Sequence, residues 1–93
     1  MIRGFRGKVA ESLWERGVAK GFPASLQRRA LDKLQMLNAA HAVEDLRNPP
    51  GNRLEALRVD RAGTWSIRIN DQFRLVFRFV GSDAFDVEIV DYH

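Results

Sequence analysis

The C-terminal part of the chain alternates between apolar and polar positions in three successive runs, over residues 65–70, 73–79 and 85–90. Alternation with a period of two is typical of strands that bury one face and leave the other open to solvent or a ligand. Short polar or glycine-containing segments separate the runs. The pattern therefore predicts an antiparallel meander of three strands.

The N-terminal part shows the longer spacing of amphipathic helices. Residues 8–16 place apolar side chains at helical spacing, and Gly17 follows as a natural stop. A second, stronger helix is predicted to open at Pro23, because proline suits a first helical turn. We interpret His41, at the end of its apolar stripe, as a partly buried histidine at the helix end. The whole stripe consists of Leu26, Ala30, Leu34, Leu37 and His41.

Two shorter segments complete the predicted fold. Residues 2–5 form a candidate first strand, and Asn48-Pro49-Pro50-Gly51-Asn52 breaks regular structure at the turn from helices into sheet. Because 93 residues are too few for two independent cores, we expect one domain over residues 1–93. The predicted class is α+β, with two N-terminal helices packed on a small, mostly antiparallel sheet.

The alternation also predicts how the strands pair, because a slip of one residue would turn every side chain to the wrong face. A loop over residues 70–72 brings apolar residues opposite each other and sets Arg68 directly opposite Arg74. In the same register, Tyr92 lies on the face that carries Arg74. A loop over residues 81–83 predicts a second set of pairs: Phe79 with Phe85, Phe77 with Val87, and Arg78 with Asp86.

Two of these pairs carry charge, and they differ in kind. Arg78 and Asp86 form an ordinary cross-strand ion pair, for which we expect a structural role. Arg68 and Arg74 set like charges opposite each other, which costs stability unless an anion lies between them. Glu88 lies diagonally nearby and is expected to neutralise part of this charge. Arg74 has no carboxylate directly opposite it, so it is the better candidate for binding phosphate.

Composition narrows the possible chemistry. The chain has no cysteine, which excludes disulfides, a thiol nucleophile and a cysteine-based zinc site. Twelve of the 15 basic residues are arginine, whose planar fork suits phosphate and stacks on bases, so an RNA or phosphate partner is favoured. Residues 1–43 carry eight basic and three acidic groups, whereas residues 44–93 carry seven and nine. This balance argues against a uniformly basic protein that coats DNA.

The sequence contains no membrane or export signal. No apolar run approaches the ~18 residues of a membrane span. No signal-peptide core follows Met1. We therefore expect a soluble, cytoplasmic protein with no membrane contact.

The chain ends on Asp91-Tyr92-His93, which combines a carboxylate, a phenol and an imidazole directly after the last predicted strand. A frayed chain end rarely needs such side chains, so we interpret the tripeptide as part of a site. It would close one end of a sheet face that carries Arg58, Arg68 and Arg74. No Gly-rich phosphate loop, HExxH metal signature or Ser-His-Asp constellation is recognisable, and we expect no metal and no cofactor.

Such a set of residues suits phosphodiester cleavage without a metal. Arginines would neutralise the charge that grows on the phosphorane, and a histidine or aspartate would move protons. An aromatic ring would stack on a splayed base. The residues alone therefore point to chemistry on RNA.

Three segments carry a resemblance to a known family: residues 48–57 (NPPGNRLEAL), 61–70 (RAGTWSIRIN) and 86–93 (DVEIVDYH). With the opening residues 1–5, they make nearly the whole chain resemble HigB-type toxins of the RelE superfamily. The resemblance implies a RelE-like α+β fold. It also implies the toxin of a type II toxin–antitoxin system.

The activity that this resemblance implies is that of an endoribonuclease, an mRNA interferase that works in the ribosomal A site without a metal. The transcript's own 2′-hydroxyl attacks the adjacent phosphate, which leaves a cyclic or 3′ phosphate and a 5′ hydroxyl and inhibits translation. The implied partners are the 70S ribosome, mRNA and a HigA-like antitoxin with a helix-turn-helix domain. Operator DNA would be reached only through that antitoxin.

Carried over position by position, the resemblance assigns roles to five residues of this chain. Asp91, Tyr92 and His93 match the functional ending of the family. Arg74 matches the phosphate-stabilising arginine of the penultimate strand, and Arg58 stands where another member has a lysine. Further RNA contacts are expected from Arg53, Arg61 and Arg68.

One position departs from the family pattern. Where a close relative places a second active-site histidine, before the Arg58 position, this chain has Glu55. Either Glu55 acts as a proton carrier, or His93 and Asp91 carry proton transfer without it. Which group is the general base and which the general acid stays open.

Two other interpretations also stay open. A ParE-type toxin on the same fold would act on DNA gyrase, and a non-catalytic module would use the arginine face only to dock RNA or a partner protein. The terminal Asp-Tyr-His sequence argues against the first, because a gyrase poison needs no proton carriers at a sheet edge. Glu55 keeps the second open, because an anion beside RNA phosphate is unfavourable.

Overall fold

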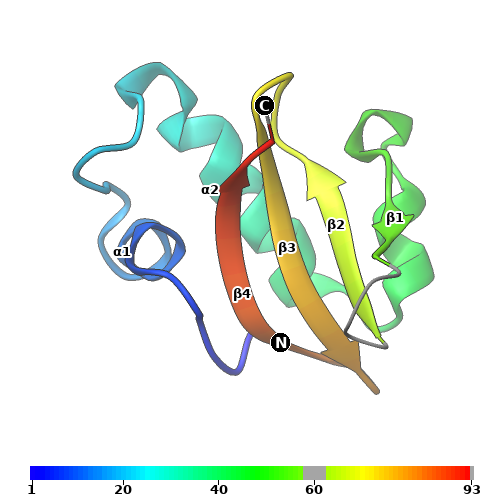
Figure 1. The fold of residues 1–93 in the computed structure, drawn as a ribbon. Coiled ribbons are helices and arrows are strands. Elements are labelled where there is room, and N and C mark those ends of the chain that lie inside the picture. The colour runs from blue at the N-terminus through cyan, green and yellow to red at the C-terminus, as the bar shows by residue number, and fades with distance from the viewer. Residues whose placement is uncertain (58–62, 93) are drawn as a thin grey trace.

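The computed structural model describes residues 1–57 and 63–92, which form helices packed on an antiparallel sheet with strand order β1-β2-β3-β4 (Figure 1). The predicted α+β class is confirmed. The helices are α1 (Lys8–Arg16) and α2 (Ala24–Ala39), followed by the 3₁₀ helices η1 (Val43–Arg47) and η2 (Pro50–Asn52). The strands are β1 (Glu55–Ala56), β2 (Thr64–Arg68), β3 (Phe73–Val80) and β4 (Asp83–Asp91).

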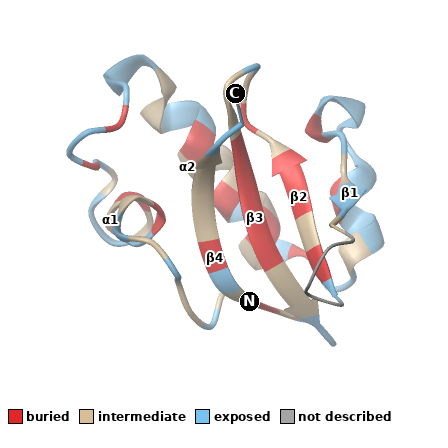
Figure 2. Cartoon of the chain, in the orientation of Figure 1, coloured by how far each residue is buried: buried red, intermediate tan, exposed pale blue. Residues whose placement is uncertain are grey.

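The core lies between the helices and one face of the sheet. In Figure 1, α2 lies behind the sheet and α1 lies beside β4. Figure 2 shows buried residues along β2 and β3 and on both helices. Large, fully buried apolar side chains of this core include Leu13, Leu34, Leu37, Ile67, Leu75 and Phe77. Within the described residues, no helix is both long and apolar enough to cross a membrane.

Both predicted helices are present, and α1 ends as expected. Gly17 adopts a left-handed backbone (φ 78°), and its N–H donates to the Leu13 carbonyl at 2.9 Å. Glycine tolerates this conformation without steric cost, which is why helices so often stop there. The longer helix α2 follows Pro23 and buries Ala30, Leu34 and Leu37 against the sheet.

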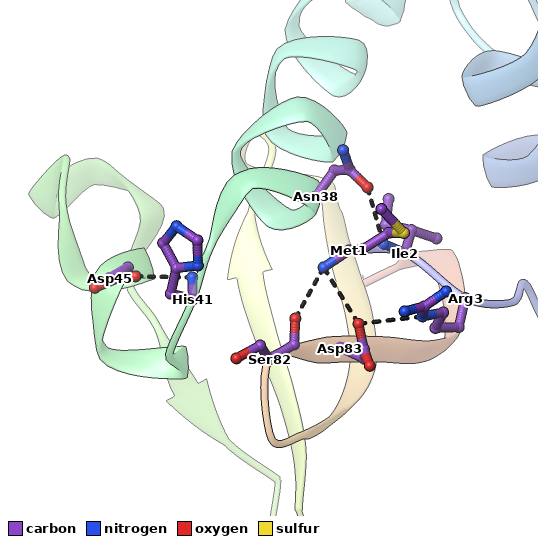
Figure 3. Close-up of polar contacts among 8 residues, drawn as sticks. All are labelled: Met1, Ile2, Arg3, Asn38, His41, Asp45, Ser82 and Asp83. Atoms are coloured by element: carbon purple, nitrogen blue, oxygen red, sulfur yellow. Dashed lines mark hydrogen bonds and ion pairs between the residues drawn. The ribbon is translucent and has the colours of Figure 1, made fainter.

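The expectation for His41 is wrong. Helix α2 ends at Ala39, Leu37 is the last buried residue of the stripe, and His41 is exposed beyond the helix. The His41 backbone N–H instead donates to the Asp45 carboxylate at 2.9 Å, at the start of η1 (Figure 3). Backbone hydrogen bonds from Ala42 and then His41 hold the pKa of Asp45 below its ordinary value.

The N-terminal segment lies along the outer edge of β4, parallel to it. Ile2 and Phe5 form isolated bridges to Ala84 and Val87, so the predicted strand over residues 2–5 is two separate bridges. The Ile2 N–H donates to Asn38 on α2 at 2.9 Å (Figure 3). Ion pairs to Asp83 hold the first residues close to the β3–β4 turn. This segment covers an edge that would otherwise expose unpaired backbone groups.

The predicted register between β2 and β3 is confirmed. Trp65 lies opposite Phe77, and Arg68 lies opposite Arg74. The turn between the strands is held by the Asn70 side chain, whose Oδ1 accepts hydrogen bonds from two following backbone N–H groups. Asparagine commonly closes turns in this way. The pattern missed β1, because two residues are too few to show alternation.

The predicted register between β3 and β4 is wrong near the turn and right beyond it. Val80 pairs with Asp83, so the turn has two residues instead of three, with Gly81 at φ 63°. A β-bulge then shifts the register by one residue at Asp86, whose φ is 54°. From Val76, opposite Glu88, the pairs are those that the alternation predicts.

This bulge changes which side chains reach the core. Ala84 and Val87 are fully buried there, whereas Phe85 lies opposite Arg78 and outside the core cluster. Phe79 therefore lies opposite Ala84 instead of Phe85. Arg78 lies opposite Phe85 instead of Asp86, but the expected ion pair between Arg78 and Asp86 still forms, with 3.4 Å from Nε to Oδ2. The face of the sheet opposite α2 carries Glu55, Ser66, Arg74, Val76, Arg78 and Phe85, and we call it the outer face.

The segment between α2 and β1 is held by Asn52, which is fully buried. Residues 48–52 were predicted to have no regular structure, but their last three form η2. The Asn52 Nδ2 group donates to the Leu46 carbonyl at 3.1 Å, and its Oδ1 accepts from Lys33 of α2. Burial and then the charge of Arg29 lower the pKa of Lys33.

Asn52→Ala should lower the free energy of unfolding by roughly 1–3 kcal/mol, because it leaves the buried Leu46 carbonyl without a donor. The exposed Gln35→Ala change on α2 is the matched control and should lie within about 0.5 kcal/mol of wild type. Urea denaturation measures both values. Equal stability of the two variants would contradict the role assigned to Asn52.

Candidate functional site

Arg74, in the middle of the outer face, is only 7% exposed. Its Nε donates to the Ser66 hydroxyl at 2.9 Å, and its Nη2 donates to the Arg53 carbonyl at 2.6 Å. A longer bond of 3.4 Å joins Nη2 to the Ser66 carbonyl. The Arg74 guanidinium is thus fixed from two sides by neutral oxygen atoms.

Two exposed side chains contact the rest of this guanidinium, one at its remaining edge and one against its face. The Arg74 Nη1 atom lies 3.8 Å from the Glu55 carboxylate, whose side chain is 57% exposed. The Tyr92 ring lies under the guanidinium, with 5.6 Å from its carbon to the ring centroid. Since Nε and Nη2 are already bonded, Nη1 is the group best placed to bind an incoming anion.

The contact with Glu55 corrects one expectation. Arg74 does have a carboxylate beside it, that of Glu55 on β1, while Glu88 lies opposite Val76, diagonal to Arg74, as predicted. The alternation missed this because Glu55 pairs with Ser66 through a strand too short to predict. Glu55 therefore lies at the open edge of Arg74, where an anion would bind.

Arg68 and Arg74 lie opposite each other, but each has its own carboxylate neighbour. Arg68 forms a short hydrogen bond and ion pair with Asp71 in the β2–β3 turn. This bond, with the charge of Arg68, lowers the pKa of Asp71. The Asp71 carboxylate therefore offsets part of the like charge that Arg68 and Arg74 set opposite each other. Arg53 is exposed, and it is its backbone carbonyl that contacts the site.

The end of the chain is held by the β2–β3 turn. Asp91 lies opposite Phe73 and accepts a hydrogen bond from the Gln72 side chain at 3.0 Å. The Tyr92 N–H donates to the Gln72 carbonyl at 2.6 Å. Tyr92 therefore lies beside Arg74, as the register predicts, while its side chain stays 51% exposed.

Three of the predicted site residues, Arg58, Arg61 and His93, lie outside the described residues. The described ones divide into two groups. Glu55, Arg74 and Tyr92 come together, with Asp91 adjacent in the chain. Arg68 lies opposite Arg74 but is paired with Asp71, and Arg53 contributes its backbone carbonyl.

Sequence reasoning missed two residues that position this site. Ser66 is fully buried and orients Arg74, and Gln72 anchors both Asp91 and Tyr92. The register itself contains the signal for Ser66, because it places a small hydroxyl residue on the face of Arg74 in the neighbouring strand. No comparable pattern points to Gln72, which acts partly through its backbone.

The arrangement suits an anion with a planar or extended group attached. Arg74 offers a fixed charged donor in a partly desolvated position, Tyr92 offers an aromatic face, and Glu55 offers a carboxylate. Among the described residues, no group of three or more histidine or acidic side chains is arranged to hold a metal ion. A surface hollow on α1 contains none of the predicted site residues and is lined by Lys8, Val9, Glu11, Ser12, Glu15, Arg16, Ala19 and Lys20.

The sequence of this chain is similar to those of known toxins. Residues 3–93 match the model of a family described as the RelE-like toxin of the type II toxin–antitoxin system HigB. The chain is similar to a Proteus vulgaris protein named endoribonuclease HigB, with 37% identity over the full length of both chains. It is also similar to toxin HigB-1 of Vibrio cholerae, with 47% identity over 67% of this chain and 65% of the relative. The chain therefore belongs to the HigB family of RelE-like toxins from type II toxin–antitoxin systems.

Proposed function

We propose that this protein is a ribosome-dependent endoribonuclease that cleaves mRNA in the A site without a metal and thereby inhibits translation. The observation that carries the proposal is the fixed guanidinium of Arg74, whose Nη1 group lies beside the exposed Tyr92 ring and the Glu55 carboxylate. Family membership supports the toxin role, and the name of the Proteus vulgaris relative supports endonuclease activity.

In the proposed reaction, the 2′-hydroxyl oxygen of one nucleotide forms a bond to the adjacent phosphorus, and the bond from phosphorus to the 5′ oxygen breaks. The products are a 2′,3′-cyclic phosphate, which can open to a 3′ phosphate, and a 5′ hydroxyl. Arg74 donates from Nη1 to a non-bridging oxygen as negative charge grows on the phosphorane. Tyr92 stacks on or orients a base.

Two proton transfers complete the balance. A base removes the proton of the 2′-hydroxyl, and an acid protonates the leaving 5′ oxygen. His93 is our candidate acid, with Asp91 or Glu55 as the base, and Arg58 adds positive charge. The position of Glu55, 3.8 Å from Arg74, supports a role at the scissile phosphate. The same position also makes Glu55 a competitor of that phosphate for Arg74.

The proposed partners follow from this activity. The toxin would meet mRNA in the ribosome and would be neutralised by a HigA-like antitoxin whose helix-turn-helix domain binds operator DNA. Such an enzyme works where translation occurs, in the cytoplasm. The family match favours this target over the DNA gyrase expected for a ParE-type toxin.

Purified protein should cleave a defined mRNA on programmed ribosomes and leave the same RNA intact when it is naked. A single 2′-deoxy nucleotide at the cleaved position should block cleavage, because it removes the attacking oxygen. Primer extension locates the cut, and enzymatic end-labelling identifies the 5′ hydroxyl. Efficient cleavage of naked RNA, or cleavage at the 2′-deoxy position, would refute the mechanism.

Arg74→Ala should lower the cleavage rate by roughly 10²–10³-fold, the usual loss when one transition-state donor is removed. Ser66→Ala should cause a smaller loss in kcat that Ser66→Thr largely restores, because threonine keeps the hydroxyl that accepts from Arg74 Nε. Arg28→Ala is the control, since Arg28 is an exposed arginine in an ion pair with Asp32 at 3.2 Å on α2. Equal rates for the Arg74 and Arg28 variants would leave a non-catalytic module as the better interpretation.

Removal of His93 should reduce cleavage by about 10²–10⁴-fold while folding and antitoxin binding are retained, because a placed acid or base contributes about that factor. His93→Ala and His93→Gln should be measured beside the truncation, since deletion moves the terminal carboxylate to Tyr92. Thermal melting and antitoxin pull-down report on folding. Wild-type cleavage in all three variants would exclude His93 from proton transfer.

A further inference from the structure

The β-bulge on β4 places an aromatic residue where the sequence pattern does not expect one. Without the extra residue at Asp86, Phe85 would point into the core, as its alternation with Val87 predicts. Instead Phe85 lies on the outer face, only partly buried and outside the core cluster. Bulges often serve to re-aim a side chain near functional sites. The cost of exposing a phenylalanine calls for a compensating contact.

That contact is Arg78. Its guanidinium lies 4.8 Å above the Phe85 ring centroid, and its side chain is 41% exposed. Its Nε bonds to the Asp86 carboxylate at 3.4 Å. A guanidinium has two faces and five donors. One face lies over Phe85 and Nε bonds to Asp86, so a ligand can still approach the other face.

The same combination of arginine and aromatic ring occurs at the proposed cleavage site. Arg74 lies over Tyr92 as Arg78 lies over Phe85, and both arginines point to the outer face of β3. Four residues along a strand span roughly 13 Å, at ~3.3 Å per residue. A stacked nucleic acid strand advances ~3.4 Å per nucleotide, so this spacing corresponds to no more than about four nucleotides.

We propose that Arg78 and Phe85 form a second RNA subsite on the outer face, separate from the scissile phosphate. One nucleotide base stacks on the exposed face of the Arg78 guanidinium, and a phosphate of the same strand meets its positive charge. Asp86 holds the arginine flat over the ring. The inference rests on the proposed function, because it requires an RNA strand that runs along the sheet from Arg74.

Binding of short RNAs tests this subsite without requiring cleavage or ribosomes. Fully 2′-O-methylated oligonucleotides, which cannot be cut by 2′-hydroxyl attack, would be titrated into the whole protein by fluorescence anisotropy. A dinucleotide reaches only the Arg74 site, whereas a hexanucleotide of the same sequence reaches both. Wild type should bind the hexanucleotide about tenfold or more tightly, within the range that one stacked base contributes.

Arg78→Ala should reduce hexanucleotide affinity to the dinucleotide level and leave dinucleotide affinity unchanged. Phe85→Leu, which keeps the apolar volume, should act in the same direction, and Arg78→Lys should restore only part of the gain because lysine lacks the planar group. Arg74→Ala should weaken binding of both lengths. The Arg28→Ala control, which removes an exposed ion-paired arginine from α2, should change neither affinity.

Several results would overturn the subsite. Wild type could bind both lengths equally, or Arg78→Ala could weaken dinucleotide and hexanucleotide alike. An equal loss in Arg28→Ala would show a general charge effect. Loss of antitoxin binding alone in the Arg78 variant would assign the Arg78–Phe85 pair to a protein interface.

The subsite and the proposed function can also fail separately. A length-dependent gain in affinity that needs Arg78, in a protein that does not cleave mRNA on ribosomes, would refute the proposed function and retain the subsite.

Discussion

The guanidinium of Arg74 is charged and almost excluded from water, so its donors need partners within the fold. Ser66 on the neighbouring strand supplies two of its oxygen partners, and the backbone before β1 supplies a third. This third oxygen is the carbonyl of Arg53, a residue with a left-handed backbone (φ 46°). The outer face of the sheet is therefore arranged around one arginine, and the short edge strand is attached to the sheet partly through it.

The helices, three of the strands and one register could be predicted because each depends on a periodic pattern. Arg68 opposite Arg74 follows from alternation and a turn closed by Asn70. The β3–β4 turn could not be predicted in the same way, because a two-residue turn followed by a bulge breaks the period and then restores it. The only local sign of the bulge is Asp86 itself, since aspartate tolerates a left-handed backbone better than most residues.

The candidate site was predictable to a similar extent. Tyr92 and Arg74 meet because both belong to regular strands whose register the alternation determines. Glu55 and Ser66 reach the same point through β1, a strand that has no periodic signature. Whether two segments with no periodic pattern between them come together depends on tertiary packing, and the order of apolar and polar residues does not reveal it. This chain therefore combines a predictable scaffold with electrostatics that only the tertiary structure shows.

Because Arg74 bonds to the Arg53 carbonyl, its side chain has a structural role in addition to its proposed catalytic one. A substitution at Arg74 removes a donor from the proposed chemistry and also leaves buried oxygen atoms unsatisfied in the scaffold. Losses of 1–2 kcal/mol in stability can change the cellular abundance of a protein several-fold. Cells that carry such a variant would thus hold less toxin as well as a slower one. Their growth would report both effects together, and toxin levels must be measured before any gain in growth is attributed to catalysis.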